Sequence, residues 1–130
     1  MRTVILHYHL FKNAGTSLDA ILRQNFGERW LTREFADAAN SEAAAERIAA
    51  PPEGIAYSSH TAQGPLPQIP GVRVISVLFL RDPVARIRSA HAFERRQAEA
   101  GRTETLGARL AGEHGLEGYV RARLALPGDR

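Results

Sequence analysis

Apolar and polar residues alternate in short runs along the first quarter of the chain. Residues 3–8 form an apolar run that is typical of a buried strand. In residues 16–26 the apolar side chains recur at helical spacing, which predicts an amphipathic helix that ends at Gly27. Asp19 is expected in its first turn, where a negative charge suits the helix dipole. The apolar face of this helix comprises Leu18, Ile21, Leu22 and Phe26.

The middle of the chain is richer in alanine, proline and glycine. Residues 32–50 predict a helix, mainly in SEAAAERIAA, with Asn40 or Ser41 as its cap and Pro51-Pro52 at its end. A weaker strand follows within GIAYSSH, residues 54–60. The proline- and glycine-rich residues 61–71 predict a loop.

Residues 72–80, VRVISVLFL, give the strongest strand signal, because their β-branched and apolar composition is typical of a buried parallel strand. Asp82 is a good N-cap and Pro83 suits a first helical position, so we expect a helix up to about Glu99. A further helix is expected around residues 116–125. This order of elements predicts an α/β fold with a parallel sheet, whose ligands bind at the carboxyl ends of the strands.

Composition narrows the class of protein. With 130 residues, 44% hydrophobic and 24% charged, residues 1–130 are expected to form a single globular domain. No run of eighteen apolar residues is present, and we expect neither a membrane span nor a signal peptide. The absence of cysteine excludes disulfides, zinc-thiolate sites and cysteine nucleophiles, and fits a cytoplasmic protein.

The net charge of +3 suits a small anionic ligand but does not by itself indicate nucleic acid, so no nucleic-acid partner is expected. Sixteen of the seventeen basic residues are arginine, and Lys12 is the single lysine. The position of this single lysine in the chain is therefore informative.

Lys12 lies in HLFKNAGTSL, residues 9–18, between the first predicted strand and the first predicted helix. A helix N-terminus offers unpaired N–H groups and a positive dipole end, and a glycine before it lets an anion approach the backbone. Lys12, Thr16 and Ser17 would add a charge and further donors, which predicts a phosphate or sulfate cradle. A helix capped by Thr16 or Ser17, with Gly15 serving the turn, is an equally good interpretation of this loop alone.

The loop is not a Walker A motif, because in GxxxxGK[ST] the lysine directly follows the last glycine, whereas Lys12 precedes Gly15 by three positions. No magnesium-binding aspartate follows an apolar strand in Walker B fashion, since Asp82 is explained as a helix cap. A divergent P-loop kinase is therefore disfavoured.

A second motif favours the interpretation of the first loop as an anion-binding site. LRDPVARIRS, residues 80–89, places Arg81 at a strand end and Ser89 eight residues later. Together with HLFKNAGTSL, this segment resembles the sulfotransferases that use 3′-phosphoadenosine 5′-phosphosulfate (PAPS), in particular the Golgi-type carbohydrate branch and its bacterial relatives. Those proteins carry a first motif like HIPKTAGTSL and a second like LRDPVxRxxS. Phe11 stands here in place of the usual proline, and Asn13 in place of the usual Thr or Cys.

The resemblance implies a P-loop-like three-layer fold, with a parallel sheet flanked by helices, and a role for each matching residue. Lys12 would hold the 5′-phosphosulfate together with the backbone of Asn13, Ala14, Gly15, Thr16 and Ser17. Arg81 and Ser89 would hold the 3′-phosphate, for which an arginine fork and a hydroxyl are suitable groups. PAPS would be the co-substrate, and a hydroxyl-bearing molecule, such as a carbohydrate, the acceptor.

His60, in AYSSHTAQG, is the candidate base for the acceptor proton, because a histidine after a middle strand serves this role in the carbohydrate enzymes. The alternative is a loop histidine bonded to the backbone. His7 and His9 would face one side of a strand. Such a pair can bind a metal, but no third ligand is evident, so no metal is expected. His9 matches the histidine of the first family motif, and the resemblance implies that it orients the loop.

The resemblance covers residues 3 to about 126, the N-terminal half of the family domain, so the fold is expected to be incomplete. The alternative function is a non-catalytic module that binds 3′-phosphoadenosine 5′-phosphate (PAP) or another anion and needs further sequence or a partner.

Overall fold

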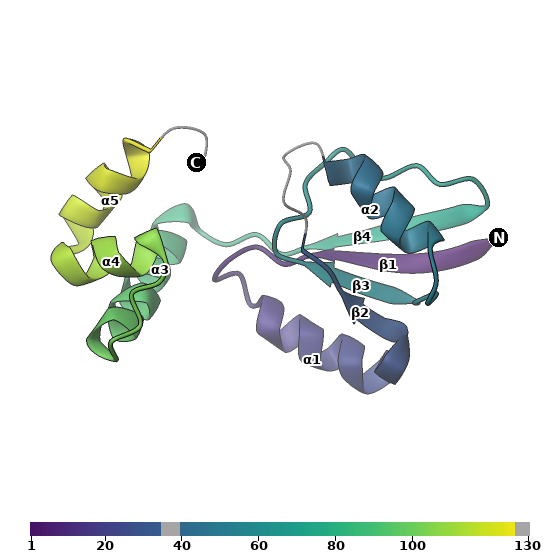
Figure 1. The fold of residues 1–130 in the computed structure, drawn as a ribbon, viewed down its shortest axis with the longest axis horizontal. Helices are drawn as coiled ribbons and strands as arrows, with labels where there is room; N and C mark the ends of the chain where they lie inside the picture. The colour runs from purple at the N-terminus through teal and green to yellow at the C-terminus, as the bar shows by residue number, and fades with distance from the viewer. Residues whose placement is uncertain (35–39, 127–130) are drawn as a thin grey trace. The chain divides into compact units, whose positions relative to one another are not determined.

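The computed structural model describes residues 1–34 and 40–126 (Figure 1). The chain divides into two compact units, Met1–Leu80 and Arg81–Arg130, and each is described by itself. The prediction that residues 1–130 form one domain stays a prediction.

The first unit is an α/β layer structure, as predicted. Its sheet has four parallel strands in the order β2-β3-β1-β4. Figure 1 shows helix α1 on one face of this sheet and helix α2 on the other. Along the chain the elements are β1 (Arg2–Tyr8), α1 (Gly15–Phe26), the 3-10 turn η1 (Gly27–Arg29), β2 (Trp30–Thr32), α2 (Asn40–Ala49), β3 (Ala56–Ser59) and β4 (Val72–Leu78).

The alternation of side chains along β1 divides its residues between the two faces of the sheet. Val4 and Leu6 face α2, where they form the hydrophobic core with Ile48 and Tyr57. His7 lies on the opposite face, toward α1. One face of β1 therefore stabilises the fold through apolar burial, while the other presents polar side chains to α1.

Helix α1 ends as predicted, with Gly27 at φ 53° as its C-cap. Its apolar face is narrower than the sequence indicates, because Leu22 is buried but the side chain of Ile21 is 55% exposed. Asp19 is the fifth residue of α1 rather than a first-turn residue, and the first turn holds no acidic side chain. The expectation that Asp19 serves the helix dipole is therefore wrong.

Helix α2 begins at Asn40, so its cap falls outside the described residues. The prediction that Ser41 caps the helix is wrong, since its hydroxyl donates to the Pro65 carbonyl oxygen, 2.7 Å away. Strand β2, only three residues long, lacks a clear sequence signal because its run is too short to show a period.

Strand β4 differs most from its prediction. Its apolar composition predicts burial, but β4 pairs only with β1 and forms one edge of the sheet of described strands. Ile75 is 41% exposed and Leu78 is 47% exposed. An edge strand lacks the second neighbour that covers a central strand.

Up to residue 126, the second unit forms three helices, α3 (Pro83–Glu99), α4 (Leu106–Glu113) and α5 (Leu116–Leu124). The predicted cap is confirmed, because the Asp82 carboxylate accepts from the Ala85 N–H at 2.7 Å. The predicted helix at 116–125 is confirmed as α5, whereas α4 was not predicted.

Glu94 organises these three helices. It is buried and accepts a hydrogen bond from the Tyr119 hydroxyl at 2.5 Å. Burial and then this hydrogen bond raise the pKa of Tyr119 well above its ordinary value. A side chain at Gly107 would overlap the Glu94 carboxylate, so the glycine that weakens the helix signal of α4 makes room for this contact.

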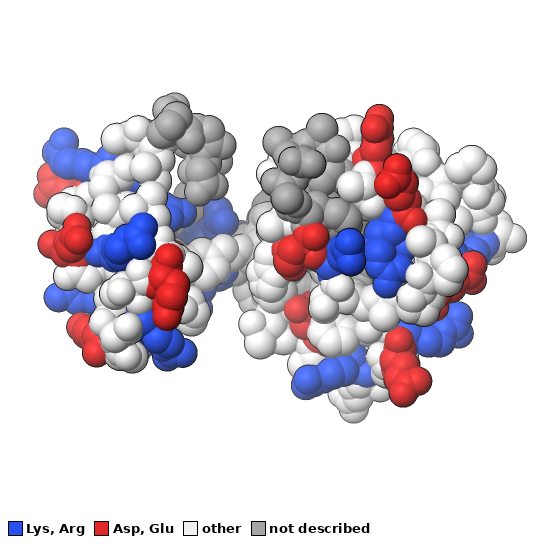
Figure 2. Space-filling model, viewed as in Figure 1, with Lys and Arg blue, Asp and Glu red and all other residues white. Residues whose placement is uncertain are grey.

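Figure 2 shows that, on the face in view, Lys and Arg side chains are interspersed with Asp and Glu and form no continuous basic surface. A ligand attracted to this face would therefore respond to local arrangement rather than to an extended field. Among the described residues, no helix is both long enough and apolar enough to cross a lipid bilayer.

Candidate active site

The site forms where β1 and β3 end on the α1 side of the sheet. The first predicted loop leaves β1 here, and it contains two non-glycine residues in the left-handed region, Lys12 at φ 60° and Ala14 at φ 59°. Such a conformation costs on the order of 1–3 kcal/mol per residue and clusters at functional sites. The backbone of this loop is therefore held in a form that its sequence does not itself favour.

The loop leaves the N-terminus of α1 without a side-chain cap. Ala14 occupies the cap position, and no side chain there accepts a hydrogen bond from the helix. The interpretation in which Thr16 or Ser17 caps the helix is therefore wrong. The Gly15 and Thr16 N–H groups open the first turn and have no partner within the helix, whereas the Ser17 N–H donates to the Ala14 carbonyl oxygen at 3.2 Å.

Asn13 holds the loop to the sheet. Its side-chain amide donates to the carbonyl oxygen of Phe79, just beyond β4, at 2.9 Å. Its backbone N–H donates to the Leu10 carbonyl at 3.3 Å. Its buried Oδ1 has no hydrogen-bond partner among the residues that the structure describes. Asn13 thus joins the first loop to the carboxyl end of β4, the strand that leads into the second motif.

Gly15 is needed because a histidine lies against it. A Cβ at this position would overlap the His9 ring at Cδ2 and Nε2. His9 follows β1, and its backbone N–H donates to the Ser59 carbonyl at 2.8 Å, which extends the pairing of β1 with β3. The close contact brings the His9 imidazole to the start of α1.

Asp19 binds His7 of β1 and His9, which follows this strand. One carboxylate oxygen lies 2.8 Å from His7 Nδ1, and the other lies 2.8 Å from His9 Nδ1. The Ser58 hydroxyl donates to Asp19 at 2.6 Å and accepts from the Trp30 indole N–H at 3.0 Å. We name the group formed by His7, His9, Asp19 and Ser58 the Asp19 clamp.

Burial and hydrogen bonding set the charges in the Asp19 clamp. Burial lowers the pKa of His7, and this effect exceeds the opposing influence of Asp19. For Asp19, burial alone would raise the pKa, but hydrogen bonds from Ser58 and His7 and the nearby histidines lower it below its ordinary value. At neutral pH the clamp therefore holds a carboxylate and a neutral His7, whose ring proton lies on Nδ1.

His7, His9 and Asp19 are also the described residues best placed to hold a metal ion, since their donor atoms lie within 4.8 Å of one another. The sequence does not reveal Asp19 as the third donor. The two imidazole rings stack, however, with centroids 5.1 Å apart and planes 18° apart. Because a metal should lie near the plane of each ligating ring, near-parallel rings suit two hydrogen bonds to one carboxylate better than one shared ion.

His60 joins this group by stacking on His9, with ring centroids 4.0 Å apart and planes 27° apart. Its Nδ1 lies 3.1 Å from Glu34 Oε1, and its backbone N–H also donates to the Glu34 carboxylate. His60 is thus bonded to an acidic side chain rather than to the backbone, and its side chain is 57% exposed.

The predicted site residues fall into two groups. Lys12, Asn13, Ala14, Gly15, Thr16, Ser17 and His60 lie in the first unit, at the carboxyl edge of the sheet. Arg81 and Ser89 belong to the second unit, where Arg81 lies two residues before α3 and Ser89 lies within its second turn. The joint grip on one nucleotide by both motifs stays a prediction.

Sequence reasoning missed Asp19 and Glu34 as site residues. Asp19 had a usable signal, because it lies three residues before Leu22 and so shares its sheet-facing side of α1. Glu34 follows a strand too short to recognise, and nothing in the sequence connects it with a histidine 26 positions later.

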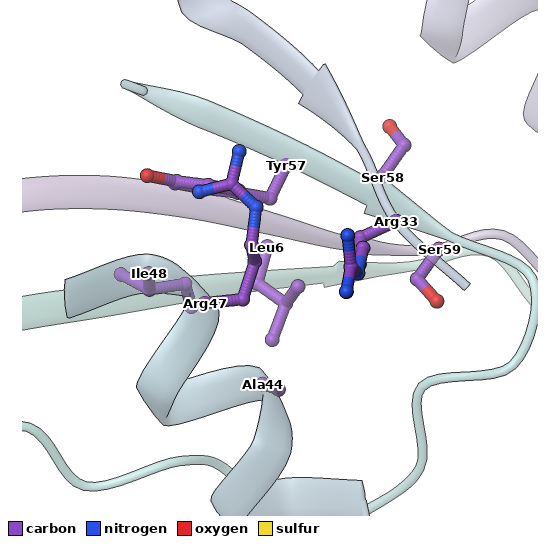
Figure 3. Close-up of a pocket in the computed structure, with 8 residues that line it drawn as sticks. All are labelled: Leu6, Arg33, Ala44, Arg47, Ile48, Tyr57, Ser58 and Ser59. Carbon is purple, nitrogen blue, oxygen red and sulfur yellow. The ribbon is translucent and has the colours of Figure 1, made fainter. Parts of the chain in front are cut away.

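A shallow pocket lies on the other side of the sheet, beneath α2 (Figure 3). Leu6, Ala44 and Ile48 form apolar walls, with Arg33 and Arg47 beside them. Figure 3 shows the Ser58 and Ser59 side chains pointing to opposite sides of β3. Ser58, whose hydroxyl belongs to the Asp19 clamp, also lines this pocket, so the pocket and the clamp share strand β3.

No protein-family model matches this chain, and no solved structure matches it. A protein from Archaeoglobus fulgidus (strain ATCC 49558 / DSM 4304 / JCM 9628 / NBRC 100126 / VC-16), which bears the name "Uncharacterized protein", is 36% identical over 132 residues. The similarity covers 97% of this chain and 51% of that protein. The chain thus spans about half the length of the relative it matches.

Proposed function

We propose that this chain is the nucleotide-binding portion of a sulfotransferase that moves the sulfuryl group of PAPS to a hydroxyl acceptor, for which a carbohydrate is the class favoured by the resemblance. The observation that carries the proposal is the uncapped N-terminus of α1, reached through a loop in which Lys12 and Ala14 have positive φ. A cradle of this kind suits a phosphate or sulfate group.

The residues of the first loop fit an anion, except that Asn13 and Ser17 use their backbone N–H groups within the protein. Lys12 supplies the charge, and the Gly15 and Thr16 N–H groups at the start of α1 supply donors, whereas the Ser17 N–H donates to the Ala14 carbonyl oxygen. Asn13 uses its own N–H and its side-chain amide within the protein, so its part is to hold the loop in place. Arg81 and Ser89 keep their proposed role at the 3′-phosphate, which would distinguish PAPS from other adenine nucleotides.

The proposed reaction is an in-line transfer that relies mainly on positioning and charge stabilisation. The acceptor oxygen forms a bond to sulfur while the bond from sulfur to the 5′-phosphate oxygen breaks. The electron pair stays on that oxygen, where the ammonium of Lys12 stabilises the growing charge. The acceptor proton passes to His60.

Binding of PAP, the product nucleotide, tests the proposal without requiring transfer. We expect PAP to raise the melting temperature of the chain more than AMP or ATP does at equal concentration, because only PAP carries the 3′-phosphate. If the three nucleotides raised the melting temperature equally, or if none of them raised it, the proposal would be contradicted.

Removal of the Lys12 charge tests the role of one residue in PAP binding. In Lys12→Ala, the affinity for PAP should fall about tenfold or more, because a charge-assisted hydrogen bond contributes about 1.5–3 kcal/mol. Arg23→Ala is the matched control, since Arg23 is an exposed cation in the last turn of the same helix. Thermal-shift titration compares the two variants, and an equal loss in both would refute a specific role for Lys12.

The second candidate function is a non-catalytic PAP-binding module. The 51% coverage of the archaeal relative favours it, because that relative carries about as much sequence again. If the chain binds PAP but transfers no labelled sulfate from PAPS to any acceptor, the result would support the module and not the enzyme.

A further inference from the structure

We propose that Glu34 is a positioning residue that fixes the His60 imidazole with its proton on Nδ1, so that Nε2 is the atom that accepts the proton of the acceptor hydroxyl. The catalytic consequence rests on the proposed transferase function. The position of the ring proton is a property of the chain by itself and can be measured without any substrate.

The Glu34 carboxylate contacts the His60 segment at several points. Each of its oxygens lies 3.1 Å from the backbone nitrogen of His60, and Oε1 lies 3.1 Å from Nδ1 of the ring. The side chain of Thr61 adds a hydrogen bond. An ionised carboxylate can only accept, so the hydrogen of a neutral His60 must lie on Nδ1, and Nε2 keeps its lone pair.

The charge of Glu34 is maintained by the same contacts. Burial alone would raise its pKa, but hydrogen bonds from the backbone and ring of His60 and from Thr61 lower the pKa below its ordinary value. Glu34 is therefore ionised throughout the range in which a histidine can act as a base.

The Asp19 clamp fixes the His60 ring from a second direction. His9, which is nine-tenths buried and bonded to Asp19, lies against one face of the His60 ring with centroids 4.0 Å apart. The His60 side chain is nevertheless 57% exposed. Glu34 thus holds one nitrogen and His9 supports one face, while the exposed part of the ring stays open to an acceptor.

Stability does not explain the pair. The side chains of Glu34 and His60 are 50% and 57% exposed, and ion pairs at such positions contribute little to folding. A carboxylate that orients a histidine and stabilises its protonated form is, in contrast, a recurrent way to support a base. In the proposed step, the proton leaves the acceptor oxygen for Nε2 as the oxygen bonds to sulfur, and Glu34 stabilises the resulting imidazolium.

Nitrogen-15 NMR of the histidine rings tests the tautomer directly, at a pH above their titration. In the wild type, His60 should carry its proton on Nδ1, and in Glu34→Ala the proton should shift toward Nε2. Glu34→Gln should retain the Nδ1 proton, since an amide oxygen also accepts a hydrogen bond. Glu28→Ala, which removes an exposed carboxylate before β2, should change nothing. A wild-type proton on Nε2, or an unchanged tautomer in Glu34→Ala, would overturn the proposal.

Transfer kinetics test the catalytic consequence. We expect Glu34→Ala to lower kcat about tenfold to a hundredfold, within the contribution of general base catalysis, with little change in KM for PAPS. Glu34→Gln should lie between Glu34→Ala and the wild type. An unchanged kcat in Glu34→Ala would refute the catalytic role of Glu34. If no variant transfers sulfate, the transferase function fails while the tautomer measurement still decides the part played by Glu34.

Discussion

At the scale of single residues, the site depends on close contacts that a side-chain pattern does not report. The Asp19 carboxylate is shared by two imidazoles, and the His9 ring occupies the space in which a Gly15 side chain would lie. The sequence indicates that His7 and His9 share a face, and the structure confirms it. That both would bind a residue ten and twelve positions later required the packing of α1 on the sheet.

The contact between Gly15 and His9 can be tested by adding one methyl group. In Gly15→Ala the new Cβ would overlap the His9 ring, which must move away from Asp19 and His60. We expect a loss of about 1–3 kcal/mol in the free energy of unfolding, typical of overpacking, together with weaker PAP binding. Denaturant melts and PAP titration measure these effects.

Gly115→Ala is the control for this prediction. Gly115 has φ −68°, and nothing lies within 4 Å of the position of its Cβ. Because Gly115 is the N-cap of α5, alanine should cost only the modest loss of a poorer cap, well below the loss expected in Gly15→Ala. If Gly15→Ala cost equally little, the close contact would not exist in solution.

At the scale of elements, residue patterns predicted the positions of the long helices and strands better than they predicted how exposed these elements are. The start of α3 was predictable, because the Asp82 cap and Pro83 act locally. The exposure of β4 was not predictable, because an apolar composition does not distinguish an edge strand from a central strand. The short β2 and the glycine-containing α4 needed tertiary contacts that a local pattern lacks.

The packing of α2 on the sheet gives a prediction at this scale. Ile48 is 1% exposed in the core with Val4, Leu6 and Tyr57. Ile48→Ala should reduce the free energy of unfolding by about 2–5 kcal/mol, through lost burial and the cavity left behind. Ile21→Ala in α1 should cost much less, because Ile21 is 55% exposed. Similar losses in urea melts of both variants would contradict this assignment of the core.

At the scale of the whole molecule, the fold class followed from the order of elements, whereas the grouping of the site did not. Parallel strands direct their carboxyl ends to one edge, so the first loop after β1 and His60 after β3 lie at the same edge of the sheet. Their actual link passes through the stack on His9, which depends on ring orientation. The relation of Arg81 and Ser89 to the first loop stays a prediction.

The Asp19 clamp makes the stability of the protein depend on pH. The folded-state pKa of His7 is lowered from 6.5, so below about pH 6.5 the unfolded chain binds a proton that the folded chain resists. The pKa of Asp19 is lowered from 3.8, and its contribution is lost at still lower pH. The free energy of unfolding should therefore fall as the pH drops from 6.5.

Urea melts between pH 5 and 8 measure this dependence. His7→Gln provides the comparison, because glutamine does not titrate in that range. The slope of stability against pH just below 6.5 should be smaller in this variant than in the wild type. An identical slope would show that His7 is not the group responsible.

The outer edge of β4 has a consequence for how the protein behaves in concentrated solution. Among the described strands, β4 pairs only with β1, so its outer edge carries backbone donors and acceptors without a strand partner, with Ile75 and Leu78 partly exposed beside them. Such an edge is a template on which the strand of another copy can add, and Arg73 is the exposed charge within β4 that opposes this. We therefore expect aggregation to begin at β4.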